Sequence, residues 1–218
     1  MSPADPASVA RPPWRELLCD GALRRLARLS ALRTEDAVLW LGRGGEKAVK
    51  VIEKIVPCQA ETQGSLAGIE EQSLSLVIAP ELASERGLDV ALGLLRSLLA
   101  PDGVAAVVVR AFVGTEVPEP LRAFWAKKLP EPLRTLKETL SRFSALGFEP
   151  LTTELLGEPS LAAHDEQLLA EACGSASGGE ALAEAAAGLH HGANLGLFIG
   201  RRVEFGAPPR WPRRGLAE

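Results

Sequence analysis

Three glycines, Gly42, Gly44 and Gly45, stand between the apolar segment Ala37–Leu41 and residues 47–55, whose apolar spacing predicts a helix. Glycine tolerates positive φ and has no side chain, so the backbone N–H groups of such a turn can approach a ligand closely. The first turn of the following helix adds unpaired N–H groups and the positive end of the helix dipole. This pattern is typical of a cradle for a phosphate or a nucleoside. The alternative is a tight strand-to-helix connection, which any α/β protein can contain.

The spacing of these glycines disfavours a nicotinamide or flavin site. A dinucleotide fingerprint reads G-x-G-x-x-G, and Lys47 stands where its third glycine would fall. The fingerprint also needs an acid about 20 residues after the turn, and Glu61 lies at a tolerable distance. Because only one of the two requirements is met, dinucleotide binding is the least favoured alternative.

A second candidate group follows the compact apolar run Leu74–Ala79. Such a run, closed by Pro80, is expected of a buried parallel strand. Ala79, Pro80 and Glu81 would then lie at the carboxyl edge of the sheet, where ligands bind in open α/β folds.

Four further residues, His164, Asp165, His190 and His191, are candidates for substrate contacts or for a general base. For the two adjacent histidines the alternative is a helix end before Gly192, where the helix dipole favours histidine without any catalytic role. The three cysteines lie too far apart for a C-x-x-C motif. We therefore predict no metal site and name no catalytic residue.

Charge and hydropathy narrow the classes of partner. The formal net charge of −4 gives the chain as a whole no electrostatic signature of nucleic-acid binding. Basic groups at Arg24, Arg25 and Arg28 and within residues 201–214 are expected to be a solvated helix face and a basic tail, with an acidic partner or RNA as the alternative. No uncharged apolar run reaches about 18 residues, and the first 13 residues lack a signal-peptide core, so we expect a cytoplasmic protein without a membrane partner.

The elements that must position these residues alternate between strands and helices. This order predicts an α/β fold with a doubly wound, mostly parallel sheet and helices on both of its faces. We expect Ala37–Leu41, Leu74–Ala79 and residues 104–109 to be adjacent, buried parallel strands. Further helices are expected at residues 14–30, 85–99, 133–146 and, in two pieces, 157–188, and further strands at residues 148–156 and 194–201, one of which is free to run antiparallel.

The remaining segments predict little regular structure. Residues 55–59 are expected to form a brief strand, followed by a loop or short helical turn at 61–72. Residues 1–13 are expected to be a flexible arm, 14–205 a single domain and 206–218 a basic, proline-rich tail.

Five segments carry a family resemblance. They are TEDAVLWLGRGG (residues 34–45), SLSLVIA (73–79), LLRSLLAPDGVAAVVV (94–109), LSRFSALGFE (140–149) and GLFIGRR (196–202). In these segments, and in their order over residues 20–203, the chain resembles the class I S-adenosylmethionine-dependent methyltransferases. The resemblance implies a Rossmann-like methyltransferase fold and S-adenosylmethionine as the cofactor.

The chain departs from the family pattern at three points. Trp40 stands where the family has an acidic residue that helps organise the cofactor loop. Glu46 stands where the third glycine of G-x-G-x-G would fall, and its side chain is expected either to obstruct the cofactor or to point outward. The interval from Gly42 to Leu74 is too short for all the elements that the family places there. We therefore expect a fold shortened in its first half. We also expect Trp40 to lie in a helix–sheet layer or across the mouth of the glycine turn, which narrows the cofactor pocket.

Two functions follow from the resemblance and from its departures. One is a methyltransferase with weak or lost cofactor binding, and the alternative is a non-catalytic module of the same fold that serves in protein interaction or assembly. Neither a methyl acceptor nor a protein partner can be named from the sequence. The candidate cofactor contacts are Gly42, Gly44, Gly45, Glu61, Ala79, Pro80 and Glu81.

Overall fold

The computed structural model describes residues 18, 20–42, 44–66, 68–126, 129–155 and 193–204. In chain order, its helices and strands are α2 (Asp20–Leu29), β1 (Ala37–Leu41), α3 (Glu46–Ile55), β2 (Gln59–Gln63), β3 (Leu74–Ala79), α4 (Leu82–Arg86), α5 (Leu88–Leu98), β4 (Leu99–Phe112), α6 (Glu119–Trp125), β5 (Arg134–Thr135), α7 (Leu136–Ala145), β6 (Phe148–Leu155) and β7 (Ala193–Arg202).

Within the described residues, seven strands form one sheet in the order β2-β1-β3-β4-β7-β6, with the short β5 paired to β4. The strands from β2 to β4 run parallel, whereas β7 is antiparallel to both of its neighbours. β1, β3 and β4 are adjacent and parallel, with Leu39 opposite Val77 and Val77 opposite Ala105. The α/β class and the three central strands are thus confirmed, and β7 is the antiparallel strand that the sequence left open.

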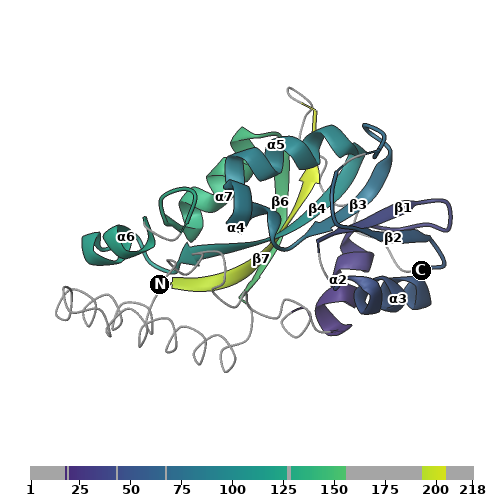
Figure 1. Cartoon of the computed structure of the whole chain (residues 1–218), viewed down its shortest axis with the longest axis horizontal. Coiled ribbons are helices and arrows are strands. Elements are labelled where there is room, and N and C mark those ends of the chain that lie inside the picture. Colours follow the sequence, from purple (N-terminus) through teal and green to yellow (C-terminus); the bar gives the residue numbers. More distant parts are fainter. Residues whose placement is uncertain are drawn as a thin grey trace, which may run out of the picture.

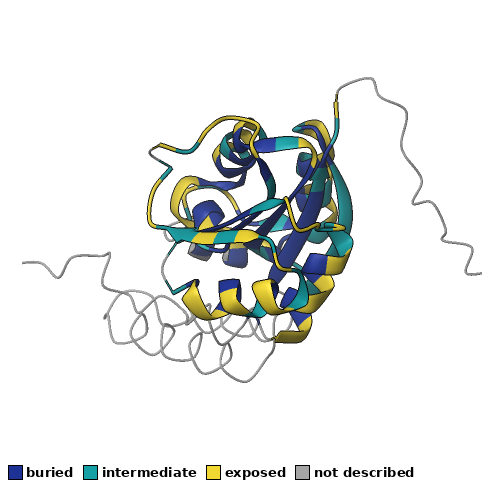
Figure 2. Cartoon of the chain, turned by 90° about the vertical axis from the view of Figure 1, so that its right-hand side faces the viewer, coloured by how far each residue is buried: buried dark blue, intermediate teal, exposed yellow. Residues whose placement is uncertain are grey.

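Helices cover both faces of the sheet (Figure 1). α2 and α3 cover one face, where Leu26 and Ile52 belong to the same buried cluster as Trp40. α4, α5 and α7 cover the other face, where Leu92 and Phe143 belong to a second buried cluster. Figure 2 shows the strands buried between helices whose outer faces are exposed.

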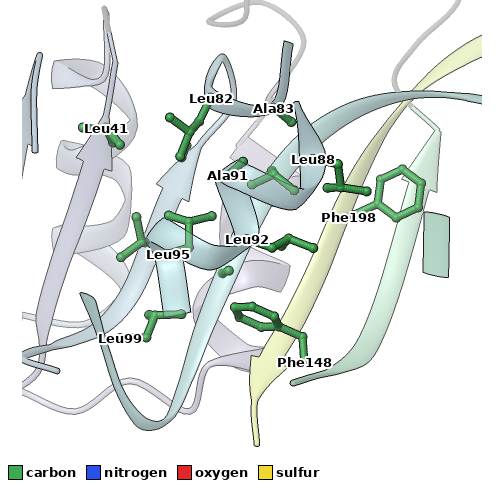
Figure 3. Packing of buried hydrophobic residues seen from close by; sticks show 14 of the residues in the cluster. Leu41, Leu82, Ala83, Leu88, Ala91, Leu92, Leu95, Leu99, Phe148 and Phe198 are labelled. Atoms are coloured by element: carbon green, nitrogen blue, oxygen red, sulfur yellow. The ribbon is translucent and has the colours of Figure 1, made fainter. Parts of the chain in front are cut away.

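The face beneath α5 shows how the helix spacing builds the core. Leu88, Leu92 and Leu95 recur at helical spacing and are all buried against the sheet, beside Phe148 of β6 and Phe198 of β7 (Figure 3). Full burial of each such leucine contributes about 1.5–3 kcal/mol. This packing holds β3 and β4 in place below the edge that carries the candidate site.

The second strand differs from the sequence expectation. The prediction of a strand at residues 55–59 is wrong, because α3 continues to Ile55 and β2 begins only at Gln59. Pro57 has no N–H and ends the helical pattern, and the N–H of Gln59 then donates to the carbonyl oxygen of Asp36, which brings the chain alongside β1. The prediction of a loop or helical turn from residue 61 is therefore wrong for residues 61–63, which belong to β2.

The shortened first half is confirmed. After β2, the described residues 64–66 and 68–73 form neither helix nor strand before β3 begins. Leu66 and Ile69 of this loop pack against the core on the α5 side of the sheet. β2 therefore lies at the edge of the sheet, next to β1.

Two boundaries differ around α5. The helix expected at residues 85–99 is two helices, α4 and α5, because Gly87 has φ 86° and interrupts the helical path. β4 begins at Leu99 rather than at residue 104, because the expected turn around Asp102, which has φ 65°, lies within the strand, where four residues of β4 stand opposite one residue of β3.

The arm at residues 1–13, the two helices expected within 157–188 and the tail at 206–218 lie outside the described residues and stay predictions. Among the helices that the structure describes, none is long and apolar enough to cross a membrane.

Candidate functional site

The carboxyl ends of the first three strands meet at one edge of the sheet. Leu41 of β1 lies opposite Gln63 of β2, and Trp40 of β1 lies opposite Ile78 of β3, so β1, β2 and β3 end at nearly the same level. Ligands of open α/β sheets bind at this edge. The glycine turn extends from it, which makes the edge the candidate site.

The backbone of the glycine turn adopts the conformation that the glycines permit. Gly42 has φ 123° and Gly44 has φ 76°, a region in which a side chain is strained. The N–H of Gly42 donates to the carbonyl oxygen of Gln63 at 2.9 Å, which ties the turn to β2. Gly45 has φ −74° and is the N-cap of α3. Because glycine has no side chain, it cannot cap the helix, and the first N–H groups of α3 need other acceptors.

Trp40 lies in the helix–sheet layer, which is one of the two positions predicted for it. Its side chain is 1% exposed and belongs to the cluster beneath α2 and α3. A Cβ on Gly45 would overlap the Trp40 indole and would lie 2.7 Å from Cγ2 of Thr62. The indole therefore supports the turn from below, at the place where the family resemblance would put an acidic side chain.

Glu46 is the first residue of α3, and it is exposed. Its side chain therefore lies in solvent and outside the helix–sheet layer. An acidic residue in the first turn is also favoured by the helix dipole.

The residues that follow β3 have two different roles. Ala79 and Pro80 are buried, so only their backbone can face a ligand. Glu81 is half-buried, and its carboxylate oxygen Oε2 lies 3.6 Å from the position that a Cβ on Gly42 would occupy. The structure thus brings Glu81 to the glycine turn.

Glu61 lies on β2 opposite Leu39, two residues before the end of the strand, and it is exposed. Its Oε1 accepts a hydrogen bond from Nε2 of Gln63 at 3.0 Å. Gln63, half-buried at the end of β2, is the side chain nearest in register to the glycine turn, and the sequence analysis missed it. Along Gln59–Gln63, Ala60 and Thr62 are less exposed than Gln59 and Glu61, and this alternation marks a strand without showing that its last residue lies beside the turn.

The four polar candidates His164, Asp165, His190 and His191 lie outside the described residues. The strands that flank their segment are described. β6 ends at Leu155, and β7 begins at Ala193 opposite Phe112 at the end of β4, so both of these strand ends lie at the carboxyl edge. Within the part of the chain that the structure describes, no three His, Cys, Asp or Glu side chains are grouped so that they could hold a metal ion.

An open hollow of about 380 Å³ lies elsewhere, between α7 and β6. It is lined by Leu136, Lys137, Leu140, Ser141, Ser144 and Pro150. β6 and β1 are separated by three other strands in the sheet, so this hollow does not belong to the glycine turn.

Known proteins resemble the chain in structure. No protein-family model matches it, and no curated protein matches its sequence. A putative sarcosine dimethylglycine methyltransferase from Galdieria sulphuraria superimposes with a TM-score of 0.59 at 17% identity, over 89% of this chain and 90% of the other. A geranyl diphosphate methyltransferase in complex with SAM gives 0.58 at 13% identity, over 92% of each chain.

A third solved structure agrees with these two. The geranyl diphosphate C-methyltransferase from Streptomyces coelicolor A3(2), in complex with Mg²⁺, geranyl diphosphate and S-adenosyl-L-homocysteine, gives a TM-score of 0.56 at 10% identity, over 92% of this chain and 89% of the other. Identities this low establish the fold and nothing finer. Together with the sheet order and the glycine turn after β1, they show that the chain has the fold of the class I S-adenosylmethionine-dependent methyltransferases.

Proposed function

We propose that the chain is a methyltransferase-like protein that binds S-adenosylmethionine weakly, at the glycine turn. The observation that carries the proposal is the positive φ of Gly42 and Gly44 between β1 and α3, in a fold that other proteins use to bind S-adenosylmethionine. Backbone that approaches a ligand at this point leaves no room for a Cβ.

The residues around the turn fit the cofactor only in part. Glu81 places a carboxylate beside Gly42, where it would face a positively charged sulfonium or ammonium group. Gln63 ends β2 with an amide, which accepts hydrogen bonds on one atom, whereas a carboxylate accepts on two. Trp40 supplies no acceptor for the loop. Losses of this kind each cost about 1 kcal/mol, so the two together should weaken cofactor binding roughly 30-fold relative to a site that has both carboxylates.

The reaction asks little of the protein beyond positioning. The sulfonium of S-adenosylmethionine supplies an activated methyl group, so a nucleophile held in line at about 3 Å reacts without a dedicated acid or base. The roles open to this chain are to hold the cofactor by the backbone of the turn and to orient an acceptor at the carboxyl edge.

The second candidate function is a non-catalytic module for protein interaction or assembly. Trp40 favours it, because an indole buried beneath Gly45 supports the turn without a side-chain contact to the cofactor. A module of this kind needs the fold and not the ligand.

Calorimetry and thermal-shift titration with S-adenosylmethionine and S-adenosylhomocysteine test the proposal, because a ligand that binds only the folded state raises Tm by mass action. Gly44→Val should abolish the heat of binding in the folded protein, since a branched side chain would stand where the backbone meets the ligand. Gly68→Val is the matched control, because Gly68 also has a positive φ, 81°, and a Cβ there meets no atom within 4 Å. If neither ligand shifts Tm at millimolar concentration, cofactor binding is overturned and the non-catalytic module is the remaining candidate.

A further inference from the structure

A positively charged side chain ends the apolar run of β4 at the carboxyl edge. Residues 104–109 are all apolar, and Arg110 follows them and is half-buried. β3 ends at Ala79, opposite Val107, whereas β4 continues to Phe112. Arg110 therefore stands beyond the end of β3, at the same edge of the sheet as the glycine turn.

The ring of Trp125 holds this side chain from α6. The guanidinium carbon Cζ of Arg110 lies 4.2 Å from the centroid of the Trp125 ring, and Trp125 is 4% exposed. Stacking on an aromatic ring occupies the face of a guanidinium, while its N–H donors point outward in the plane. Trp125 thus fixes the plane in which Arg110 can donate, which lowers the entropy lost when a ligand binds.

The spacing between Arg110 and the glycine turn suits a small acceptor. β3 alone separates β1 from β4, so the two strands lie two strand spacings apart, or about 10 Å, and Arg110 lies three residues, or roughly 10 Å, further along β4 than Val107, which is opposite the end of β3. A molecule with one end at Arg110 can therefore reach across the end of β3 toward a cofactor at Gly42 and Gly44.

We propose that Arg110, oriented by Trp125, binds an oxyanion group of the methyl acceptor, a carboxylate or a phosphate. A planar guanidinium matches both groups because it offers parallel N–H donors to two oxygen atoms. The role of the bound molecule as methyl acceptor rests on the proposed methyltransferase function, whereas the anion site rests on Arg110 and Trp125 alone.

Thermal-shift and calorimetric titrations of the full chain with sodium acetate and with inorganic pyrophosphate, at constant ionic strength, test the site. At least one of the two anions should raise Tm by about 2 °C or more at saturation. Arg110→Gln should weaken that binding at least tenfold, whereas Arg110→Lys should retain part of it. Arg86→Gln is the matched control, since Arg86 is exposed at the end of α4, and it should leave anion binding unchanged.

A spectroscopic readout separates the site from a purely structural role. The indole N–H signal of Trp125, assigned among the four tryptophans by Trp125→Phe, should shift on titration with the binding anion in the wild type and not in Arg110→Gln. Binding of acetate alone assigns a carboxylate, and binding of pyrophosphate alone assigns a phosphate. The proposal is overturned if neither anion binds, or if Arg110→Gln binds as tightly as the wild type.

The two proposals fail in different ways. These titrations contain no cofactor, so loss of S-adenosylmethionine binding would remove the role as a methyl acceptor site and leave the anion result intact. Conversely, cofactor binding that survives in Arg110→Gln, together with an unresponsive Trp125 signal, would overturn the anion site and leave the methyltransferase function standing.

Discussion

The indole of Trp40 occupies the space in which a Cβ on Gly45 would lie. Gly45 has φ −74°, which any residue can adopt, so the requirement for glycine comes from the side chains of Trp40 and Thr62 and not from the backbone. The strand and the glycine turn are thus coupled through one side chain. A sequence that places tryptophan at position 40 can keep this close approach of α3 only with glycine at position 45.

This coupling predicts a stability change. Gly45→Ala should lower the free energy of unfolding by about 1–3 kcal/mol, because the added methyl group forces the buried indole to shift. In a Trp40→Leu background the same substitution should cost much less, and denaturant unfolding of the four proteins measures the coupling. Gly93→Ala is the control, because Gly93 lies exposed within α5 with open space at its Cβ position, and alanine there should stabilise slightly. Equal costs of Gly45→Ala in both backgrounds would contradict the coupling.

Arg96 joins three segments at the opposite edge of the sheet. Its Nη1 donates to the carbonyl oxygen of Gly147 at 2.7 Å and to that of Val203 at 2.9 Å. Burial holds the pKa of Arg96 below its ordinary value, and the nearby Arg202 lowers it further, but the group stays charged. Arg96→Met should therefore lower the free energy of unfolding by about 2 kcal/mol, since it removes both bonds of a charged donor.

Urea unfolding of Arg96→Met measures this change. Arg86→Met is its control, because Arg86 is exposed on α4, and it should change stability by less than about 0.5 kcal/mol. A loss of the same size in both variants would show that the carbonyl contacts of Arg96 contribute nothing.

Asp89 gives the stability of the fold a defined pH dependence. Arg142 donates through Nε to Oδ1 at 2.9 Å and through Nη2 to Oδ2, and Nη2 of Arg134 lies 3.9 Å from Oδ1. The hydrogen bonds from Arg142 are the main cause that holds the pKa of Asp89 below its ordinary value, and the charges of both arginines add to it. The folded-state pKa is thus below that of the unfolded chain, about 3.9. The stabilisation is therefore present above about pH 4 and is lost as the pH falls through the lower folded-state pKa.

Asp89→Asn should accordingly be less stable than the wild type at pH 5 to 7, and the difference in Tm should shrink as the pH falls below 4. Melting curves over pH 2 to 7 measure this convergence. A difference in Tm that stays constant down to pH 2 would show that the ion pair contributes through packing alone.

α7 begins with a reciprocal capping box. The N–H of Glu138 donates to Oγ1 of Thr135 at 3.1 Å, and the N–H of Thr135 donates to Oε2 of Glu138 at 2.7 Å. Thr135→Ala should lower the free energy of unfolding by about 1 kcal/mol, whereas Thr135→Ser, which keeps the acceptor, should retain most of it. Because Thr135 is 3% exposed, the serine variant also measures how much its methyl group contributes. Chemical denaturation of both variants distinguishes the cap from the packing.

The fold was predictable where local composition decides the structure. β1, β3 and residues 104–109 of β4 are apolar on both faces, which the sequence shows directly. β2 was misplaced because it is an edge strand with polar residues at four of its five positions, and only its pairing with β1 makes it a strand. The direction of β7 also depends on pairing with distant residues, so the sequence could only leave it open.

The residues of the candidate site differ in the same way: some follow from the local sequence and others depend on contacts with distant residues. The positive φ of Gly42 and Gly44 follows from the local sequence, and Glu81 follows from the end of β3. Gln63 could not be found, because its place beside the turn depends on the register of β2 against β1. Similarly, the approach of Trp125 to Arg110 joins α6 to β4 and leaves no periodic signal in the sequence.

The position of Gln63 gives the sharpest prediction for the cofactor. If S-adenosylmethionine binds with its ribose at the end of β2, a carboxylate at position 63 can accept hydrogen bonds from both ribose hydroxyls, which one amide oxygen does less well. Gln63→Glu alone would place two acids side by side, because Gln63 now donates to Glu61 at 3.0 Å. The double variant Glu61→Gln/Gln63→Glu keeps the net charge and the hydrogen-bonded pair while it moves the carboxylate to the end of the strand. We expect this variant to bind S-adenosylmethionine about five- to tenfold more tightly than the wild type, which corresponds to about 1–1.4 kcal/mol of binding free energy measured by calorimetry.

Glu61→Gln alone is the control, and it should change the affinity little, since Glu61 lies two residues before the edge. An unchanged or weaker affinity in the double variant would mean that the ribose does not lie at the end of β2.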